Sequence, residues 1–324
     1  RKTCSGFVYK ELEKAGHLIS NRCFSDPELA EWIRKTRRPS PKTFTFKTYH
    51  LRWNACYFLR ITALKEWGRP ASVHCTAQNR TAIIRTKNIG GLAADNIQEF
   101  FPDIRQILCN GKKIGVQTSV LIKPPPESPR KRKGICGPMR DAFRSSFLMA
   151  VPERKMKDAY RNAMTHIRYW YRYTKTYPSV TAESVVSAKT LKKHIFIFNP
   201  FPENPILQKV VDRMPVKFTR NHFIFHGKKY NRQEFGIILT RPNPLNRYRY
   251  AVLVCGAPWG TRLPENHKYD MIPDYIVFRK DGTVVRAGFF TNNWTFAGKD
   301  RPDLDYRNTN FIQDSKNGDQ TSGH

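Results

Sequence analysis

The sequence predicts a mixed α+β and α/β fold, in which a small β-sandwich precedes a three-layer α/β domain. Short apolar stretches recur about every ten residues between residues 43 and 123, a spacing typical of strands in an all-β unit. Beyond residue 135 the pattern changes to strand, helix, strand, helix and then further strands. That order favours a layered α/β domain with an antiparallel extension.

Residues 1–40 contain two predicted helical pieces, of which the second has clear end signals. Asp26 is placed to cap its start, Pro27 occupies the first helical position, and Pro39 lies just beyond its end. Its apolar residues fall on one face and are Leu29, Trp32 and Ile33. We expect a short amphipathic helix.

The segment 41–123 is the predicted β-sandwich, or a half barrel. Asn110 and Gly111 form a dipeptide that strongly favours a two-residue hairpin turn. The predicted strands lie in the stretches TFTFKTY, NACYFLRITAL, ASVHCTA, TAIIRTK, IRQILCNGKKIGV and SVLIK.

Residues 124–134 are proline-rich and basic, which predicts a solvated linker. A nuclear-type or phosphate-binding basic run is the alternative interpretation. Three consecutive prolines and a cluster of charges argue against a place in a core.

The segment 135–296 is the predicted α/β domain. Its expected strands and helices are strand 147–151, helix 153–173, strand 194–199, helix 204–213, and strands near 216–219, 222–226, 235–240, 250–255, 275–279 and 284–290. The apolar runs Tyr250–Cys255 and Tyr275–Phe278 are bounded by turn residues and predict buried strands. Residues 297–324 are polar without periodicity, which predicts a disordered tail.

The charge is far from balanced, with 57 Lys and Arg residues against 26 Asp and Glu residues and a net charge of +31. Such a balance attracts polyanions. The basic residues are nevertheless spread over nearly every segment, so no specific nucleic-acid partner is expected.

The seven cysteines are an odd number and include no C-x-x-C pair or zinc-like Cys/His spacing. No metal or cofactor is therefore expected. No apolar stretch has the length of a membrane span. The chain begins with Arg1 and not with Met, which suggests a fragment of a longer protein.

Five polar residues are candidate ligand-binding residues. Asn199 ends a predicted strand and Asn204 precedes a helix, so free N–H groups at the helix start would face an anion or a polar ligand. Asp141 would place a carboxylate near that edge, although a helix or turn cap is an equally good interpretation. Asn243 and Asn246 lie in the turn ahead of the Tyr250–Cys255 run.

Several stretches resemble the C-terminal part of large bacterial α/β-hydrolase proteins of the prolyl oligopeptidase/esterase type, over roughly residues 16–294. They are RRPSPKTFTFKTYHLRWNACYFLRI, GPMRDAFRSSFLM, IFIFNPFPENPILQKVVDRMPV, RPNPLNRYRYAVLVCG, PDYIVF and AGFF. In that family the hydrolase comes first, and its last helix leads through an Arg-Arg-x-Pro segment into a small β-domain and a closing α/β domain. The resemblance implies that residues 1–40 are the end of a hydrolase domain.

The resemblance also gives His17 a role. A Gly-His ahead of the final hydrolase helix supplies the base of the catalytic triad in the family, and Gly16 and His17 stand in that place. The preceding KELEKA segment departs from the family pattern, so an ordinary helix-end residue is the alternative. A triad also needs a serine and a carboxylate, and the chain contains no G-x-S-x-G elbow.

These observations lead to the expectation of a C-terminal fragment of a serine hydrolase. The partners would be a hydrolase domain preceding Arg1 and the ester or peptide substrate of that parent enzyme. The fragment alone should not catalyse acyl transfer, because the nucleophile and oxyanion hole would lie elsewhere. The alternatives are a basic binding module for nucleic acid or acidic polysaccharide, and an autonomous α/β enzyme using Asp141, Asn199 and Asn204.

Overall fold

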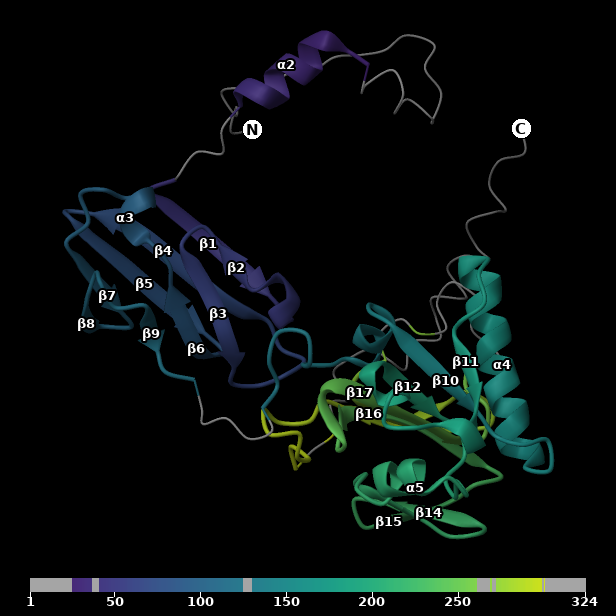
Figure 1. The fold of residues 1–324 in the computed structure, drawn as a ribbon. Coiled ribbons are helices and arrows are strands. Elements are labelled where there is room, and N and C mark those ends of the chain that lie inside the picture. The colour runs from purple at the N-terminus through teal and green to yellow at the C-terminus, as the bar shows by residue number, and fades with distance from the viewer. Residues whose placement is uncertain are drawn as a thin grey trace, which may run out of the picture. The chain divides into compact units, whose positions relative to one another are not determined.

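A computed structural model describes residues 25–36, 41–124, 130–260, 269, 272–298 and 300. The chain divides into two compact units, Arg1–Pro41 and Lys42–His324. The described residues form four sheets and four α-helices, which confirms a mixed α+β protein dominated by sheets (Figure 1). Of the helices in this part of the chain, none has the length and apolar character needed to cross a bilayer.

In the first unit, helix α2 (Pro27–Lys35) follows the sequence prediction. The Asp26 carboxylate accepts hydrogen bonds from the backbone N–H groups of Glu28 and Leu29, as an N-cap should. None of its residues is buried within the unit. His17 and most of the predicted tail lie outside the described residues.

The second unit begins with two sheets that share one hydrophobic core. The first has the strand order β1 (Thr43–Thr48), β4 (Ala71–Gln78), β5 (Thr81–Lys87), β7 (Gln106–Cys109) and β8 (Lys112–Gly115). The other has the order β2 (Ala55–Cys56), β3 (Leu59–Leu64), β6 (Ile89–Ala94) and β9 (Val120–Ile122). Helix α3 (Ile97–Phe100) lies between β6 and β7 in the chain.

The predicted hairpin turn is present between β7 and β8. Asn110 and Gly111 have φ angles of 49° and 85°, the left-handed conformation that an Asn-Gly turn requires. Strand β6 was missed by the sequence prediction, because its Gly90-Gly91 pair is unusual in a strand.

A seven-stranded mixed sheet forms the centre of the remaining residues. Its order is β11 (Val180–Ala182), β10 (Phe147–Val151), β12 (His194–Ile197), β17 (Asn246–Gly256), β16 (Phe235–Asn243), β18 (Tyr275–Arg279) and β19 (Val284–Gly288). The first four strands run parallel and the last three pair antiparallel. As predicted, the Tyr250–Cys255 and Tyr275–Phe278 runs are buried throughout.

Helices and a small sheet accompany these strands. They are α4 (Lys157–Thr174), α5 (Pro205–Val211) and the sheet of β13 (Val216–Phe218), β14 (His222–Phe225) and β15 (Lys228–Asn231). In Figure 1, α4 runs beside β10 and β11, and α5 lies next to β14 and β15. All of them contribute to one large core together with the central sheet.

The predicted linker 124–134 differs from a solvated connector at Lys131. Its side chain is fully buried, and its ammonium forms an ion pair with the equally buried Asp274. The ring centroids of Trp67 and Trp294 lie 4.3 and 4.7 Å from Nζ. The charge that argued for solvation is therefore neutralised inside the protein, and the expectation was wrong for this residue.

Burial is the strongest influence on the Lys131–Asp274 pair: it lowers the pKa of Lys131 and raises the pKa of Asp274, while their attraction opposes both shifts. Asp274 also accepts a hydrogen bond from the backbone N–H of Phe290 at 2.8 Å. Trp67 donates to Asn292 at 3.0 Å, so this cluster ties the two-sheet region to residues that follow β19.

Candidate functional site

The order of the parallel strands creates a natural place for a ligand. From β10 the chain passes to β11 on one side and then to β12 on the other side of β10. The connection that leaves β10 and the connection that leaves β12 therefore run toward opposite sides of the sheet. Ligands of open α/β sheets bind at such a switch point, outside the carboxyl ends of the strands.

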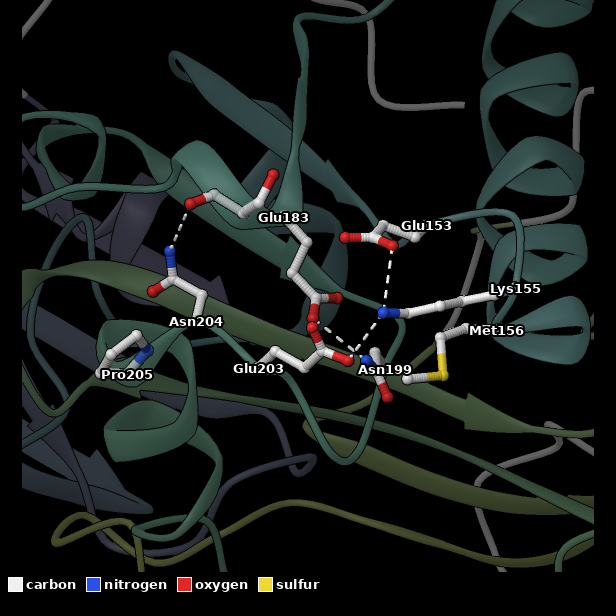
Figure 2. Close-up of a pocket in the computed structure, with 9 residues that line it drawn as sticks. Glu153, Lys155, Met156, Glu183, Asn199, Glu203, Asn204 and Pro205 are labelled. Atoms are coloured by element: carbon white, nitrogen blue, oxygen red, sulfur yellow. Dashed lines mark hydrogen bonds and ion pairs between the residues drawn. The ribbon is translucent and has the colours of Figure 1, made fainter.

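A pocket of about 170 Å³ opens at this switch point. Each neighbouring parallel strand supplies a polar residue just past its carboxyl end: Glu183 follows β11, Glu153 follows β10, and Asn199 follows β12. Figure 2 shows these side chains converging with Lys155 and Glu203. The remaining lining residues are Met156, Ser184, Asn204 and Pro205.

Glu183 is the buried carboxylate of the pocket. Its residue is 6% exposed, and Oε1 accepts a hydrogen bond from the Asn199 amide at 3.0 Å. Oε2 is buried and makes no hydrogen bond of normal distance and angle to any described residue, and the backbone N–H of Glu203 is the other donor directed at this carboxylate. Burial raises the pKa of Glu183, which the Asn199 amide and the backbone N–H of Glu203 oppose.

Lys155 joins the two carboxylates at the exposed side of the pocket. Its ammonium lies 2.9 Å from Glu203 Oε1 and 3.2 Å from Glu153 Oε2. All three side chains are more than half exposed, at 56, 66 and 54%. These hydrogen bonds and charges raise the pKa of Lys155.

Asn199 and Asn204 build the pocket, but their hydrogen bonds are used within the chain. Asn199 Oδ1 accepts from the backbone N–H of Phe201 at 3.0 Å. Asn204 Oδ1 accepts from Ile206 N and Leu207 N at 2.9 and 3.2 Å, so it caps α5. The expectation of free N–H groups for an anion at this helix start was therefore wrong.

Asp141, Asn243 and Asn246 lie at the opposite, amino-terminal edge of the parallel strands. Asn243 Oδ1 accepts from Leu245 N at 2.9 Å and so shapes the β16–β17 turn, whereas Asn246 Nδ2 donates to Leu191 O at 2.8 Å and ties that turn to the residues ahead of β12. The structure thus brings Asn199 and Asn204 together and places the other three candidates elsewhere.

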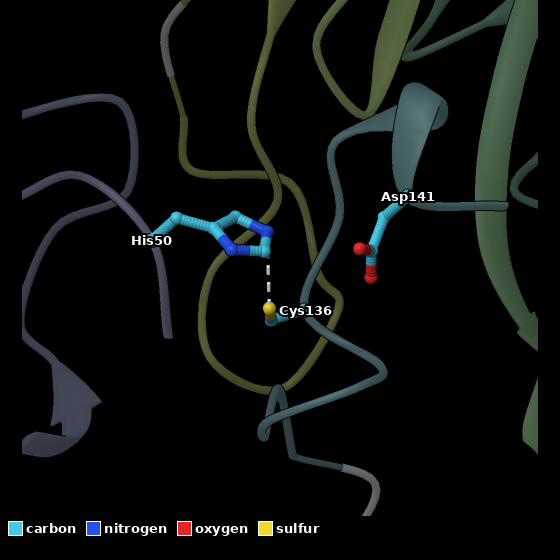
Figure 3. A group of neighbouring side chains, drawn as sticks. All are labelled: His50, Cys136 and Asp141. Carbon is cyan, nitrogen blue, oxygen red and sulfur yellow. Dashed lines mark hydrogen bonds between the residues drawn. The ribbon is translucent and has the colours of Figure 1, made fainter. Parts of the chain in front are cut away.

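Asp141 belongs to a cluster with His50 and Cys136, shown in Figure 3. The ligand atoms of these three residues lie within 4.8 Å of one another, as in a metal site. Asp141 Oδ2 accepts from Tyr250 Oη at 2.7 Å, and Tyr250 Oη accepts from Gly137 N at 2.9 Å. Burial raises the pKa of Asp141.

The hydrogen bonds of His50 do not suit a metal. Arg52 N donates to Nδ1 at 3.0 Å, so Nδ1 uses its lone pair, and Nε2 carries the hydrogen that it donates to the Gly137 carbonyl. A metal on Nε2 would need the lone pair of that nitrogen. A neutral imidazole has a free lone pair on only one nitrogen, and here that nitrogen is Nδ1. Cys136 Sγ lies 3.3 Å from Nε2, and burial raises the pKa of this thiol, which disfavours the thiolate that a metal needs.

Ser145 and His194 resemble a nucleophile and its base, since Ser145 Oγ lies 2.6 Å from His194 Nε2. The backbone N–H of Tyr250 donates to His194 Nδ1 at 2.8 Å, so Nε2 carries the hydrogen and donates it to the serine. A catalytic base needs the opposite tautomer, with a carboxylate on Nδ1–H. Burial, assisted by Arg249, lowers the pKa of His194 to about 4.

The sequence interpretation missed the charged residues of the pocket, which are Glu153, Lys155, Glu183 and Glu203. A signal was present for Glu153, which comes two residues after the predicted strand 147–151. No comparable signal pointed to Glu183, because the short strand β11 was not predicted.

The chain was compared with protein-family models, curated proteins and solved structures, and none of them matches it.

Proposed function

We propose that this chain is the C-terminal accessory region of a serine hydrolase of the prolyl oligopeptidase/esterase type, and that its α/β domain binds a small ligand. The region would consist of the last hydrolase helix, a β-sandwich connector and a three-layer α/β domain. The resemblance of the stretches between residues 37 and 290 supports the attachment to a hydrolase.

The observation that carries the binding role is the pocket at the switch point between β10 and β12. Glu183 lines this pocket and its Oε2 makes no hydrogen bond within the described part of the chain, which supports a binding role because a buried acceptor without a donor costs about 1–3 kcal/mol. A ligand that donates a hydrogen bond would recover this energy.

His194 has the tautomer in which Nε2 carries the hydrogen. This supports the expectation that the accessory region itself does not catalyse acyl transfer. Ser145 keeps its proton when the neighbouring nitrogen is a donor, so its hydroxyl is not activated. Incubation with p-nitrophenyl acetate and a fluorophosphonate probe should give no turnover above buffer and no labelled residue. A stoichiometric adduct that Ser145→Ala removes would contradict the proposal.

The sequence encoded upstream of Arg1 tests the attachment to a hydrolase. The proposal expects a continuous reading frame that contains a G-x-S-x-G elbow ahead of this chain. An upstream frame without such an elbow counts against the attachment and leaves the binding role of the pocket untouched.

A basic binding module is the second candidate, and the surroundings of Trp53 favour it. Trp53 is 60% exposed, and the guanidinium groups of Arg52 and Arg144 lie 5.2 and 5.4 Å from its ring centroid. An aromatic ring flanked by arginines is a common platform for stacked bases. Together with the net charge of +31, this arrangement suits a nucleic acid.

A salt titration with a random duplex and a single strand tests this second candidate. Sub-micromolar binding near physiological salt that Trp53→Ala weakens at least about tenfold would support it. Association that vanishes by about 0.2 M salt, equal in the Trp53→Ala variant, would contradict it.

A further inference from the structure

We propose that the switch-point pocket binds a small organic ammonium group, which displaces the Lys155 side chain and pairs with Glu183, Glu153 and Glu203. This inference rests on the proposed binding role of the pocket and is independent of the attachment to a hydrolase.

The charge of the pocket selects the sign of the ligand. Its three carboxylates, Glu153, Glu183 and Glu203, face one ammonium, that of Lys155. The chain as a whole carries a net charge of +31, so a local excess of carboxylates runs against the composition. An anion would meet repulsion here, whereas a cation would be attracted.

The buried oxygen of Glu183 selects a hydrogen-bond donor. Oε1 is already satisfied by Asn199 at 3.0 Å, and Oε2 lies buried without a partner in the described part of the chain. An ammonium carries three N–H donors and a positive charge, so it would pair with the Glu183 carboxylate once this side chain turns toward the pocket, and would favour the ionised form. A neutral ligand would satisfy only the first of these needs.

Lys155 shows that an ammonium fits between the two outer carboxylates. Its Nζ lies at hydrogen-bond distance from both, at 2.9 and 3.2 Å. The side chain is 56% exposed and flexible, so exchanging its contacts for those of a ligand costs little free energy, because exposed ion pairs are worth about 0–1 kcal/mol. Lys155 therefore acts as an internal competitor of the ligand.

The size of the pocket suits a short molecule. A volume of about 170 Å³ is close to the ~150 Å³ of a cavity that holds one benzene ring. Met156 and Pro205 supply apolar wall for a few methylene groups. A primary amine with a chain of about four carbons fits this space.

Isothermal titration of the full chain with n-butylammonium at neutral pH tests the inference, with n-butanol, butyrate and Ca²⁺ as comparison ligands. We expect n-butylammonium to bind with a Kd near ~1 mM, in line with a ligand of five heavy atoms. Glu183→Gln should weaken binding by about tenfold, since it removes one close charge pair. Lys155→Gln should tighten it by at least about threefold, because the competitor is lost.

Glu99→Gln is the matched control, because Glu99 is exposed and lies outside the pocket. It should leave the Kd unchanged, and the circular dichroism of all variants should match the parent chain. Weaker binding by Lys155→Gln, or equal binding by Glu183→Gln, would overturn the inference.

The comparison ligands show whether the pocket binds a ligand other than an ammonium or binds no ligand at all. Binding of butanol or butyrate that responds to Glu183→Gln would overturn the ammonium assignment and keep the binding role. Binding of Ca²⁺ alone would assign the carboxylates to a metal and overturn the ammonium assignment. No binding of any ligand up to ~50 mM would overturn both.

Discussion

The two edges of the seven-stranded sheet both contain buried titratable residues, yet they differ in what they leave unpaired. At the amino-terminal edge, Tyr250 donates to Asp141 and accepts from Gly137 N, while His50 accepts from Arg52 N and donates to Gly137 O. We call this set of hydrogen bonds the closed network. At the carboxyl-terminal edge, Glu183 lines a pocket, and its buried Oε2 makes no hydrogen bond to any described residue.

The amino-terminal edge also holds buried polar atoms with no partner among the described residues, Asn243 Nδ2 and Asp274 Oδ1, and the latter fills the space where a side chain on Gly137 would lie. The comparison teaches that burial and shifted pKa values alone do not mark a ligand site. An unsatisfied group on a residue that lines an open volume is the stronger indication.

The largest effect is expected from breaking the buried ion pair near the closed network. Asp274→Ala should lower the free energy of unfolding by about 3–5 kcal/mol, because the Lys131 ammonium would remain buried without a counter-charge. Urea unfolding followed by tryptophan fluorescence measures the change. Joint replacement by Lys131→Met and Asp274→Asn should recover at least half of the loss, and a single-variant effect below about 1 kcal/mol would contradict the ion pair.

The next effect concerns His194 and its pH dependence. Its pKa is lowered from 6.5 to about 4 in the folded protein, so the unfolded chain binds the proton more readily between these values. Stability should therefore fall as pH drops from 6.5 to 4, by about 2 kcal/mol after allowance for solvent screening.

His194→Asn provides the comparison, because an amide oxygen can replace Nδ1 as acceptor for Tyr250 N–H without titrating. The pH dependence of this variant should be flatter than that of the parent chain, measured by thermal unfolding across pH. Parallel curves for the two proteins would refute the assigned tautomer and its buried neutral state.

A smaller effect is expected at the scaffold of the pocket. Asn204→Ala removes the cap of α5 and the bonds to Ser184 O and Val186 O, and should cost about 1–2 kcal/mol. Asn204→Ser keeps a side-chain oxygen that can cap α5 and should cost less. Because Asn204 positions the pocket without contacting the ligand, the Kd for n-butylammonium should change less than about threefold in the Asn204→Ser variant. A larger loss would make Asn204 a ligand contact.

The smallest effect is a gain of stability on removing the buried charge of Glu183. Burial raises its pKa above the ordinary 4.5, so the folded state holds the proton more tightly and loses stability as pH rises through the shifted value. Glu183→Gln retains an acceptor for Asn199 and should be equal to or up to about 1 kcal/mol more stable than the parent chain at pH 7. A destabilised variant would show that the carboxylate gains more from its donors, Asn199 and the backbone N–H of Glu203, than its burial costs.

Local signals in the sequence were enough for many elements. Asp26 and Pro27 set the start of α2, and Asn110 with Gly111 set the β7–β8 turn, since both depend on neighbours in the chain. The strand and helix pattern from residue 147 onward was largely predicted for the same reason.

Contacts between distant residues were beyond the sequence interpretation. His50 and Cys136 are 86 residues apart, and Lys131 pairs with a residue 143 positions away. Strand β11 has three residues, too few for periodicity to show, so the switch point and Glu183 remained hidden. Asn199 and Asn204 were placed at the correct edge, but as ligand contacts and not as the scaffold that their hydrogen bonds reveal.

The most direct test of the difference between the two edges is amide chemical-shift mapping of the ¹⁵N-labelled chain during titration with n-butylammonium. The largest saturable shifts should come from Glu153, Lys155, Glu183, Ser184 and Glu203, with none above noise at His50, Cys136 or Asp141. Shifts that concentrate around the His50 cluster and leave the pocket unchanged would contradict the assignment of the ligand site to the carboxyl-terminal edge.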